Sequence, residues 1–365
     1  MGDGTVPRAA AELTPDWLTG ALRSGGVLEA DRAVTTVEVR PTAAGVGFMG
    51  EVTGLALAYD GPTTAPTTMV AKIPTQDPHV RAMLAPAAVF EREARFYEQL
   101  GPELASTARC YHAAIDVPND DFLLLLEDLS HLRLGDQLDG CGPDDAARAL
   151  EALAVLHARF WESPVLDRMG WLPPANDPCM KIGEHVFAQS LPRFLEVFAE
   201  ALDPGMAELS ERFGPRMPDL LDRFAAMPTT IGHFDYRLDN LFFDDADGAD
   251  GVRMIDFQAT SKGGFAYDLG YFLSQNLTTE DRRAHEADLL RTYHDRLVAE
   301  GVAGYDFDQL RRDHRVGVLY GWFIPVFAVG SLDVSSDRAM QLWTEVIRRA
   351  QSAIADHDAA GVLDE

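Results

Sequence analysis

The sequence predicts a bilobal α+β fold, with a small strand-rich lobe followed by a larger helical lobe. Strand-like segments dominate the first third of the chain, and helical periodicity dominates the remainder. The change comes where the apolar stretch 122–126 runs into the polar residues Glu127 and Asp128. We therefore expect an N-terminal lobe over residues 1–126, a hinge over 127–131 and a C-terminal lobe over 132–365.

The first lobe is expected to open with a helix from Thr14, because Pro15 and Asp16 suit a first helical turn. The pair Gly25–Gly26 ends it. The other elements expected in this lobe are two strands within 37–59 separated by a glycine-bearing turn, a strand over 67–74, a helix over 87–100 and a buried strand at 122–126.

The second lobe is expected to begin with a long amphipathic helix over 144–161, whose apolar residues recur at helical spacing. Residues 181–201 have a helical pattern that Pro192 is expected to interrupt. Short strands are expected at 241–243 and 252–255, and helices from about Glu280 onward.

Composition excludes several classes of function. The chain has 58 acidic and 31 basic side chains, which gives a net charge of −27. Such a field repels nucleic acid and attracts cationic ligands, although it is also typical of a charge that serves only solubility. No apolar run approaches the roughly 20 residues that span a bilayer, and the N-terminus lacks a signal-peptide pattern. We expect a soluble cytoplasmic protein without membrane insertion, and nothing indicates its oligomeric state.

The three cysteines, Cys110, Cys141 and Cys179, are far apart and form no CxxC pair. This spacing favours buried thiols in a reducing compartment and no zinc cluster.

A glycine motif, GxGxxGxV, is formed by Gly45, Gly47 and Gly50. Strands are expected on both sides of it, whereas a dinucleotide-binding turn connects a strand to a helix. The context therefore favours a glycine-rich flap whose backbone approaches nucleotide phosphates. An ordinary glycine hairpin is the alternative.

Lys72 lies inside an apolar strand, where a lysine is costly to bury unless it is paired. Glu93 shares a helix face with Phe96 and Tyr97, whereas Glu91 points elsewhere. We expect Glu93 to pair with Lys72 and Glu91 to face solvent. A lysine on an edge strand turned to solvent is the alternative.

The most specific motif is H-x-D-x-x-x-x-N, formed by His233, Asp235 and Asn240 just before a short strand. One carboxylate at this spacing can orient the proton of an attacking hydroxyl, and a neutral amide further along can reach a magnesium ion. Sixteen residues later, Asp256 stands at the end of a second strand. The spacing predicts that Asp256 shares the ion with Asn240 across a hairpin.

With these motifs the chain resembles the aminoglycoside phosphotransferase and choline-kinase-like superfamily, nearest to its ecdysteroid-kinase-like and uncharacterised bacterial branches. The resemblance rests on HFDYRLDNLFF, MIDFQATSKGGFAYDLGYFL, LEALAVLHARFW and the order of the lobes. It implies a protein-kinase-like fold with nucleotide between the lobes. It also implies transfer of the γ-phosphate of ATP or GTP, with Mg²⁺, to a hydroxyl of a small molecule.

Matched motif by motif, the resemblance implies a role for each site residue. Asp235 is expected to be the catalytic base, Arg237 is expected to lie near the transferring phosphate, and Asn240 and Asp256 are expected to be the magnesium ligands. Lys72 is expected to hold the α and β phosphates, with Glu93 as its ion-pair partner, and the main chain of Glu127 to Leu129 is expected to contact the adenine. His233 and Asp268 are expected to support the site structurally.

Two positions depart from the pattern. Phe234 stands where many relatives have glycine, and Gln258 stands where protein kinases have the glycine of DFG. The segment 259–268 is also short for a peptide-docking loop, which favours a small-molecule kinase over a protein kinase. A catalytically silent nucleotide- or metabolite-binding regulator is the other alternative, and the presence of every catalytic residue disfavours it.

The acceptor is expected to be walled by residues 173–201 and by the segment containing Tyr320 and Trp322, unless these side chains only pack in the core. The net charge favours an amine-bearing acceptor, such as an aminoglycoside or amino alcohol. Apolar walls suit a steroid or polyketide alcohol equally well.

Overall fold

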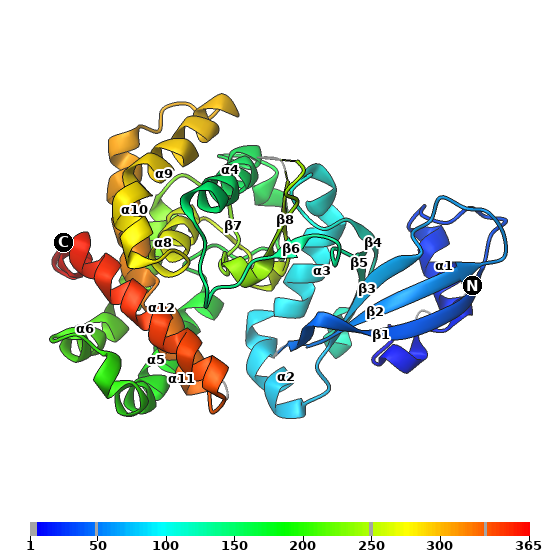
Figure 1. Ribbon diagram of the computed structural model, residues 1–365, viewed down its shortest axis with the longest axis horizontal. Coiled ribbons are helices and arrows are strands. Elements are labelled where there is room, and N and C mark those ends of the chain that lie inside the picture. Colours follow the sequence, from blue (N-terminus) through cyan, green and yellow to red (C-terminus); the bar gives the residue numbers. More distant parts are fainter. Residues whose placement is uncertain (1–5, 48–49, 248–250, 332–333) are drawn as a thin grey trace. The chain divides into compact units, whose positions relative to one another are not determined.

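The computed structural model describes residues 6–47, 50–247, 251–331 and 334–365, and the chain divides into two compact units (Figure 1). The first unit comprises Met1–Leu132 and Arg253–Ala259, and the second comprises Arg133–Val252 and Thr260–Glu365. The first contains a five-stranded sheet and the second is mainly helical, so the expected α+β class is confirmed.

The sheet of the first unit has the strand order β1-β2-β3-β5-β4, and every neighbouring pair is antiparallel. Its strands are β1 (Val34–Gly47), β2 (Gly50–Tyr59), β3 (Thr68–Pro74), β4 (Cys110–Asp116) and β5 (Asp121–Glu127). The edge strand β4 was not predicted. Most of its residues are only half-buried, so its sequence lacks a clear alternation of apolar and polar side chains.

The helices of the first unit are α1 (Pro15–Ser24), α2 (Pro78–Leu84) and α3 (Val89–Gln99). The expected cap of α1 is confirmed, because the Thr14 hydroxyl accepts a hydrogen bond from the Trp17 N–H at 3.2 Å. Helix α1 shares a buried cluster with Leu123 and Leu125 of β5. Phe122, which directly precedes Leu123 in the strand, points to the other face and stacks on Phe90 of α3, so the sheet lies between α1 and α3.

The second unit is built from nine helices within the described residues. They are α4 (Pro143–Arg159), α5 (Pro178–Val197), α6 (Met206–Phe213), α7 (Met217–Ala226), α8 (Phe265–Gln275), α9 (Thr279–Ala299), α10 (Phe307–Tyr320), α11 (Phe323–Ser331) and α12 (Asp337–Asp356). Every residue of α8 is buried, so this helix forms the centre of the unit. An amphipathic pattern therefore could not reveal it.

Short strands position the loops of the second unit. Strand β6 (Arg133–Leu134) pairs with β8 (Leu241–Phe243), and β7 (Ile231–Gly232) pairs with β10 (Ser261–Lys262). Strand β9 (Val252–Met254) leads the chain back to the first unit. The predicted strands at 241–243 and 252–255 are thus confirmed to within a residue.

The expected interruption at Pro192 is wrong, because α5 continues through it. Proline removes one backbone donor and leaves the carbonyl four residues earlier without its helical partner. Both Pro192 and Ala188 are exposed, so water can hydrate the freed carbonyl group. The helix can therefore tolerate the proline.

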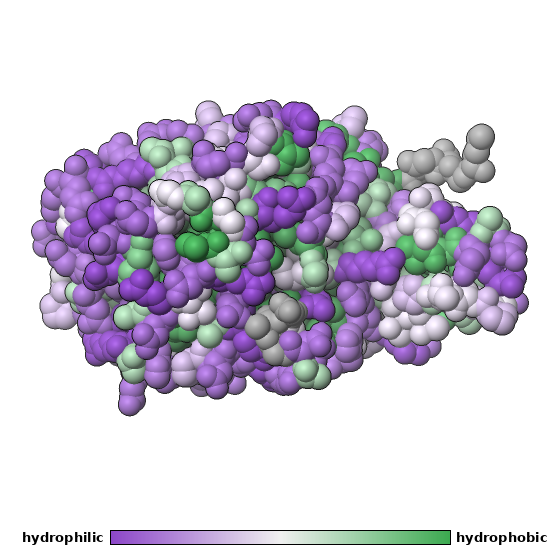
Figure 2. Space-filling model, turned by 90° about the horizontal axis from the view of Figure 1, so that it is seen from above, coloured by the Kyte–Doolittle hydropathy of each residue, from purple (hydrophilic) through white to green (hydrophobic). Residues whose placement is uncertain are grey.

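Hydrophilic side chains cover most of the surface visible in Figure 2, with small hydrophobic areas between them. The exposed large hydrophobic side chains of the described residues are scattered over several elements: Val39, Val117, Ile182, Val197 and Val298.

All three cysteines are free thiols. The sequence predicts that they are buried, but in the structure they are only half-buried. In the described part of the chain, no helix combines the length and apolar character needed to cross a membrane.

Candidate active site

The first group of predicted site residues surrounds Lys72 on β3. Its Nζ lies 2.7 Å from Oε1 of Glu93 on α3 and 2.8 Å from Oδ1 of Asp256. The predicted pair of Lys72 with Glu93 is confirmed. Glu91 lies on another face of α3 and pairs with Arg95 at 2.6 Å, so it is half-buried instead of free in solvent.

Burial and charge act in opposite directions on this group. Burial opposes the charge of Lys72, but the carboxylates of Asp256 and Glu93 outweigh it and raise the pKa of the lysine. Burial raises the pKa of Glu93 to about 7, although the ammonium group of Lys72 opposes this shift. The Glu93 side chain is 1% exposed, and its Oε2 has no hydrogen-bond partner among the described residues. Lys72 is thus a charged group held between two carboxylates.

Asp256 is fixed by the residues that follow it. Its φ of 70° lies in the left-handed region, which is strained for a residue with a side chain. The next residue, Phe257, is fully buried and stacks on Phe96 of α3 with ring centroids 3.6 Å apart. Gln258 donates from Nε2 to Oδ2 of Asp256 at 3.2 Å. These contacts hold the carboxylate beside Lys72 with its side chain 22% exposed.

The glycine motif lies where β1 meets β2, and Gly47 pairs with Gly50 in the ladder. Strands therefore flank it on both sides, as predicted. A Cβ on residue 50 would lie 2.5 Å from the carbonyl oxygen of Ile73, so sheet packing alone requires glycine there. Residues 48 and 49 of the motif lie outside the described residues, and the role of Gly45 and Gly47 toward phosphate stays a prediction.

The segment expected to meet the base of the nucleotide begins at Glu127, the last residue of β5. The Glu127 N–H donates to the carbonyl of Arg109 at 2.8 Å, and Leu129 is buried. Asp128 accepts a hydrogen bond from the Ser130 N–H at 3.0 Å. The turn is thus fixed locally, while its contact with a base stays a prediction.

The second group of site residues belongs to the second unit and is organised by Asp268. This fully buried carboxylate of α8 accepts hydrogen bonds from the N–H groups of His233 and Phe234, each at 2.7 Å. It also lies 3.3 Å from Nε2 of His157. Asp268 therefore fixes the backbone immediately before Asp235, which agrees with its expected role as a support.

Asp235 is surrounded by donors. Asn240 donates through Nδ2 to Oδ2 of Asp235 at 3.0 Å and to its backbone carbonyl at 2.8 Å. The Arg237 guanidinium lies 3.3 Å from Oδ1 of Asp235 and 3.0 Å from Oδ2 of Asp239. The Asp235 N–H donates to Nδ1 of His233 at 3.2 Å. The structure thus brings the three motif residues together with Arg237, and the Asp235 side chain is 22% exposed.

Asp256 belongs to the first unit and Asn240 to the second. Sharing of one ion between them stays a prediction.

His157 was missed as a site residue by sequence reasoning. It lies on α4, fully buried, with Nδ1 2.7 Å from the Tyr293 hydroxyl and Nε2 against Asp268. Burial lowers its pKa, against the opposing effect of the Asp268 carboxylate, and so favours the neutral ring. A signal was present, because His157 follows Leu150 and Leu153 at helical spacing and so lies on the buried face of the predicted helix.

Three side chains of the expected acceptor walls lie in the core. Trp322 is fully buried and donates from Nε1 to the Ser210 hydroxyl at 2.9 Å. Tyr320 is also buried and packs edge-on against Tyr267 and Phe224. Within residues 173–201, the buried Phe187 packs against Phe213 of α6.

Comparison with known proteins supports the fold. The protein has the same fold as a proposed aminoglycoside phosphotransferase from Ralstonia eutropha, with a TM-score of 0.54, 17% identity and coverage of 92% of this chain and 95% of the other. For a choline kinase from Cryptosporidium parvum the TM-score is 0.51, with 10% identity and coverage of 88% and 91%. An aminoglycoside phosphotransferase, APH(2″)-IIIa, solved with GDP and kanamycin, has a TM-score of 0.51, 15% identity and coverage of 89% and 95%.

A comparison with curated protein sequences found no significant match. The sequence model of the ecdysteroid kinase-like family, however, matches residues 44–301. This region contains Lys72, Glu93 and Asp256 of the first group, and Asp235, Asn240 and Asp268 of the second. It also covers well over half of the chain. The chain therefore belongs to the ecdysteroid kinase-like family.

Proposed function

We propose that this protein is a small-molecule kinase that transfers the γ-phosphate of ATP or GTP to a hydroxyl group of its acceptor in the presence of Mg²⁺. The observation that carries the proposal is the contact between Asp235 and Asn240, a carboxylate and an amide 3.0 Å apart on a loop fixed by Asp268. Phosphoryl transfer depends mainly on positioning of the reactants and on neutralisation of phosphate charge. The loop carries a carboxylate and an amide that could position the reactants, and the guanidinium of Arg237 that could neutralise charge.

Asp235 is proposed as the base that accepts the proton of the acceptor hydroxyl. Its partly exposed carboxylate can be reached by an acceptor, while Asn240 and Arg237 restrict its orientation. The Arg237 guanidinium beside it would offset negative charge that develops on the transferring phosphoryl group.

Mg²⁺ prefers oxygen ligands, and the residues present fit this preference. Asn240 uses its Nδ2 to hold Asp235, which leaves the carbonyl Oδ1 as the atom available for an ion. Asp256 contributes a partly exposed carboxylate. A bound ion would neutralise phosphate charge. The two residues are proposed as its protein ligands.

Lys72 is proposed to hold the α and β phosphates, because it is the cation at the centre of the first group. Gly45, Gly47 and Gly50 would allow the backbone to approach the phosphates. The main chain of Glu127 to Leu129 would contact the base. Since one structural neighbour was solved with GDP, both ATP and GTP are proposed as donors.

The acceptor class is proposed from charge and from the neighbours. The net charge of −27 favours amine-bearing acceptors, and kanamycin and choline are both cationic. Aminoglycosides and amino alcohols are therefore the first classes to test. Sugars, nucleosides and sterols follow as uncharged controls.

The test measures Mg²⁺-dependent release of ADP or GDP with pools of these acceptors, with the Asp235→Asn variant assayed in parallel. We expect release with one pool and a decrease of about a thousandfold in the variant, with nucleotide affinity nearly unchanged. Glu91→Gln is the matched control, because this carboxylate pairs with Arg95 on α3, on a face away from Lys72. Its rate should equal that of the native chain.

Turnover retained in Asp235→Asn would remove Asp235 from the proposed role. A native chain that binds Mg²⁺-nucleotide but is silent with every pool would favour the regulator alternative. A chain that binds no nucleotide would contradict the kinase proposal itself.

A further inference from the structure

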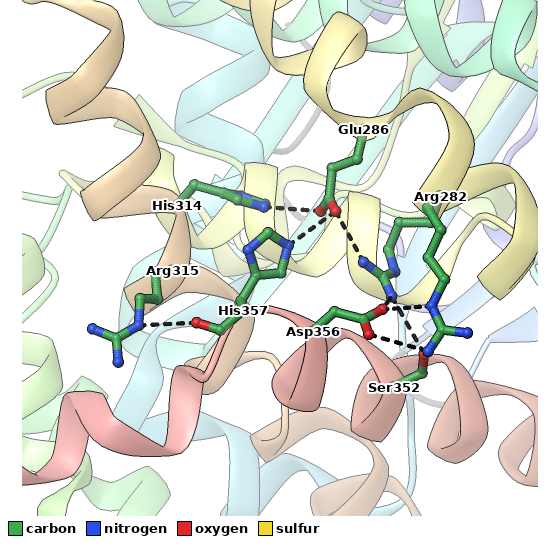
Figure 3. Close-up of polar contacts among 8 residues, drawn as sticks. Arg282, Glu286, His314, Arg315, Ser352, Asp356 and His357 are labelled. Atoms are coloured by element: carbon green, nitrogen blue, oxygen red, sulfur yellow. Dashed lines mark hydrogen bonds and ion pairs between the residues drawn. The ribbon is translucent and has the colours of Figure 1, made fainter.

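A separate group of metal-ligand side chains lies in the second unit, on helices that carry none of the proposed active-site residues. Glu286 of α9, His314 of α10 and His357, which follows α12, bring one carboxylate and two imidazoles together (Figure 3). One ligand atom from each residue lies within 4.8 Å of the other two. The proposed kinase reaction uses none of them.

The two contacts of Glu286 with the imidazoles are close to the spacing of donor atoms around a small cation. Nε2 of His314 lies 3.1 Å from Oε1 of Glu286, and Nε2 of His357 lies 2.9 Å from Oε2. Ligand atoms around a four-coordinate zinc ion, with bonds of about 2.0–2.2 Å, are about 3.3 Å apart. The two imidazole rings are nearly perpendicular, at 86°, so they approach the carboxylate from different directions. Little rearrangement would be needed to place an ion among these atoms.

The group is enclosed on one side and accessible on the other. Glu286 and His314 are buried, while the His357 side chain is 24% exposed. An ion could therefore enter from the side of His357 and lose much of its hydration at Glu286. The exposed side would leave a coordination position for water.

The surroundings hold the carboxylate in place. Arg282 donates from Nη1 to Oε2 of Glu286 at 2.9 Å and also pairs with Asp356. Arg283 donates from Nε to Asp356 at 2.7 Å, so Asp356 balances part of the arginine charge. Carboxylates that bind metals are usually themselves hydrogen-bonded, and Arg282 supplies this bond.

A further cation lies beside the group. Arg315 of α10 donates from Nε to the backbone carbonyls of His357 and Asp358, each at 3.1 Å. Nδ1 of His314 is buried and has no hydrogen-bond partner in the described part of the chain. An ion on Nε2 would move the ring proton to this unpartnered nitrogen. The absence of a partner on this nitrogen should weaken metal binding about 10–100-fold relative to a site in which it is hydrogen-bonded.

We propose that Glu286, His314 and His357 form a site for a late first-row divalent cation, with Zn²⁺ as the best chemical match. Two imidazole nitrogens and one carboxylate suit Zn²⁺, Co²⁺, Ni²⁺ or Cu²⁺, whereas Mg²⁺ requires oxygen ligands. The ion would take the place of the two Nε2 protons that now face Glu286, and each of these protons would move to Nδ1 of its own ring. It would link α9, α10 and the C-terminal segment that begins at His357.

The test titrates the full-length protein, freed of metal with a chelator, with Co²⁺ as a spectroscopic probe in the presence of excess Mg²⁺. The Mg²⁺ occupies oxygen-donor sites, including the site proposed for the kinase. We expect one equivalent of Co²⁺ with the visible absorption of nitrogen ligation, and displacement by Zn²⁺. Affinity should fall as the pH is lowered and the imidazoles gain protons.

The main variant is His357→Ala, because this residue is partly exposed and its loss should leave the fold intact. Its Co²⁺ affinity should decrease at least about tenfold. Glu286→Gln keeps the side-chain shape and removes the ligand charge, so it should have the same effect. His285→Ala is the matched control, since it removes a neighbouring imidazole of α9 outside the group. It should bind like the native chain.

A second measurement tests directly whether the ion links the C-terminal segment to α9 and α10. Zn²⁺ should slow backbone hydrogen exchange in residues 357–365 of the native chain and of His285→Ala, but not of His357→Ala. Equal Co²⁺ affinity in all variants, or a native spectrum without nitrogen ligation, overturns the proposal and leaves a purely hydrogen-bonded cluster. Since neither readout involves nucleotide or acceptor, the result is independent of the kinase proposal.

Discussion

The ring of Phe234 lies close over the backbone of Gly264. A Cβ on residue 264 would be only 2.4 Å from the Cζ atom of the Phe234 ring. Phe234 has a φ of 63°, a left-handed conformation that costs about 1–3 kcal/mol for a residue with a side chain. Burial of the ring, which is 7% exposed, offsets this cost. The residue before Asp235 is therefore held by the glycine that precedes α8.

We predict that Gly264→Ala destabilises the protein. Residue 264 has a φ of 80°, which costs about 1–2 kcal/mol for alanine, and the new Cβ would displace the Phe234 ring at a further cost of about 1–3 kcal/mol. The total loss of unfolding free energy should be about 2–5 kcal/mol. Urea unfolding followed by tryptophan fluorescence measures it.

Gly205→Ala is the matched control for this prediction. Gly205 also precedes a helix, with a φ of 89°, but a Cβ on residue 205 would meet no heavy atom within 4 Å. This variant should lose only the conformational part, about 1–2 kcal/mol. Equal losses at both positions would show that contact with Phe234 adds no constraint.

Local sequence patterns were enough to predict the parts of the site that depend on residues close together in the sequence. The pairing of Lys72 with Glu93 follows from a lysine in an apolar strand and from the helix face shared by Glu93 and Phe96, and both signals lie within a few residues. Asn240 and Asp235, which the motif spacing assigns to one site, likewise lie only five residues apart. Such contacts depend on local geometry, which a single sequence records.

Contacts between distant segments could not be derived in this way. Asp268 was expected to support the site through resemblance alone, because its hydrogen bonds join residues about 35 positions apart. The left-handed conformations of Phe234 and Asp256 depend on tertiary packing that overrides backbone preference. The helical spacing places His157 on a buried face but gives no sign of its partner Tyr293, which lies 136 positions away.

We predict a specific pH dependence of stability from Glu93. Burial raises its pKa to about 7 in the folded chain, compared with about 4.5 when it is exposed. The folded state therefore holds a proton that the unfolded state has released, so this contribution to stability is lost as pH rises from about 4.5 through 7. The melting temperature of the native chain should fall relative to that of Glu93→Gln between about pH 5 and pH 8.

Glu91→Gln separates this effect from the general loss of a carboxylate on α3. Glu91 pairs with Arg95 and is 23% exposed, so the difference in melting temperature between this variant and the native chain should stay constant over the same pH range. A constant difference for Glu93→Gln as well would mean that Glu93 is ionised throughout.

We predict that Asp256→Ala removes the dependence of nucleotide binding on Mg²⁺. In the native chain, Mg²⁺ should increase ATP or GTP affinity at least about tenfold, because the ion neutralises charge between phosphates and carboxylate. In the variant, calorimetry with and without Mg²⁺ should give similar affinities, while Lys72 keeps its pair with Glu93. An undiminished response to Mg²⁺ would exclude Asp256 as a ligand.

We predict that Asp268→Asn lowers both stability and turnover. The carboxylate accepts hydrogen bonds from two N–H groups, those of His233 and Phe234, whereas an asparagine offers one acceptor oxygen and turns an amide donor toward the other. A buried N–H left without a partner costs about 1–3 kcal/mol. Nucleotide affinity should change little, because Lys72 belongs to the other unit, while kcat should fall as the Asp235 loop loses its position. An unchanged kcat in a measurably destabilised variant would restrict Asp268 to folding and separate it from the positioning of the base.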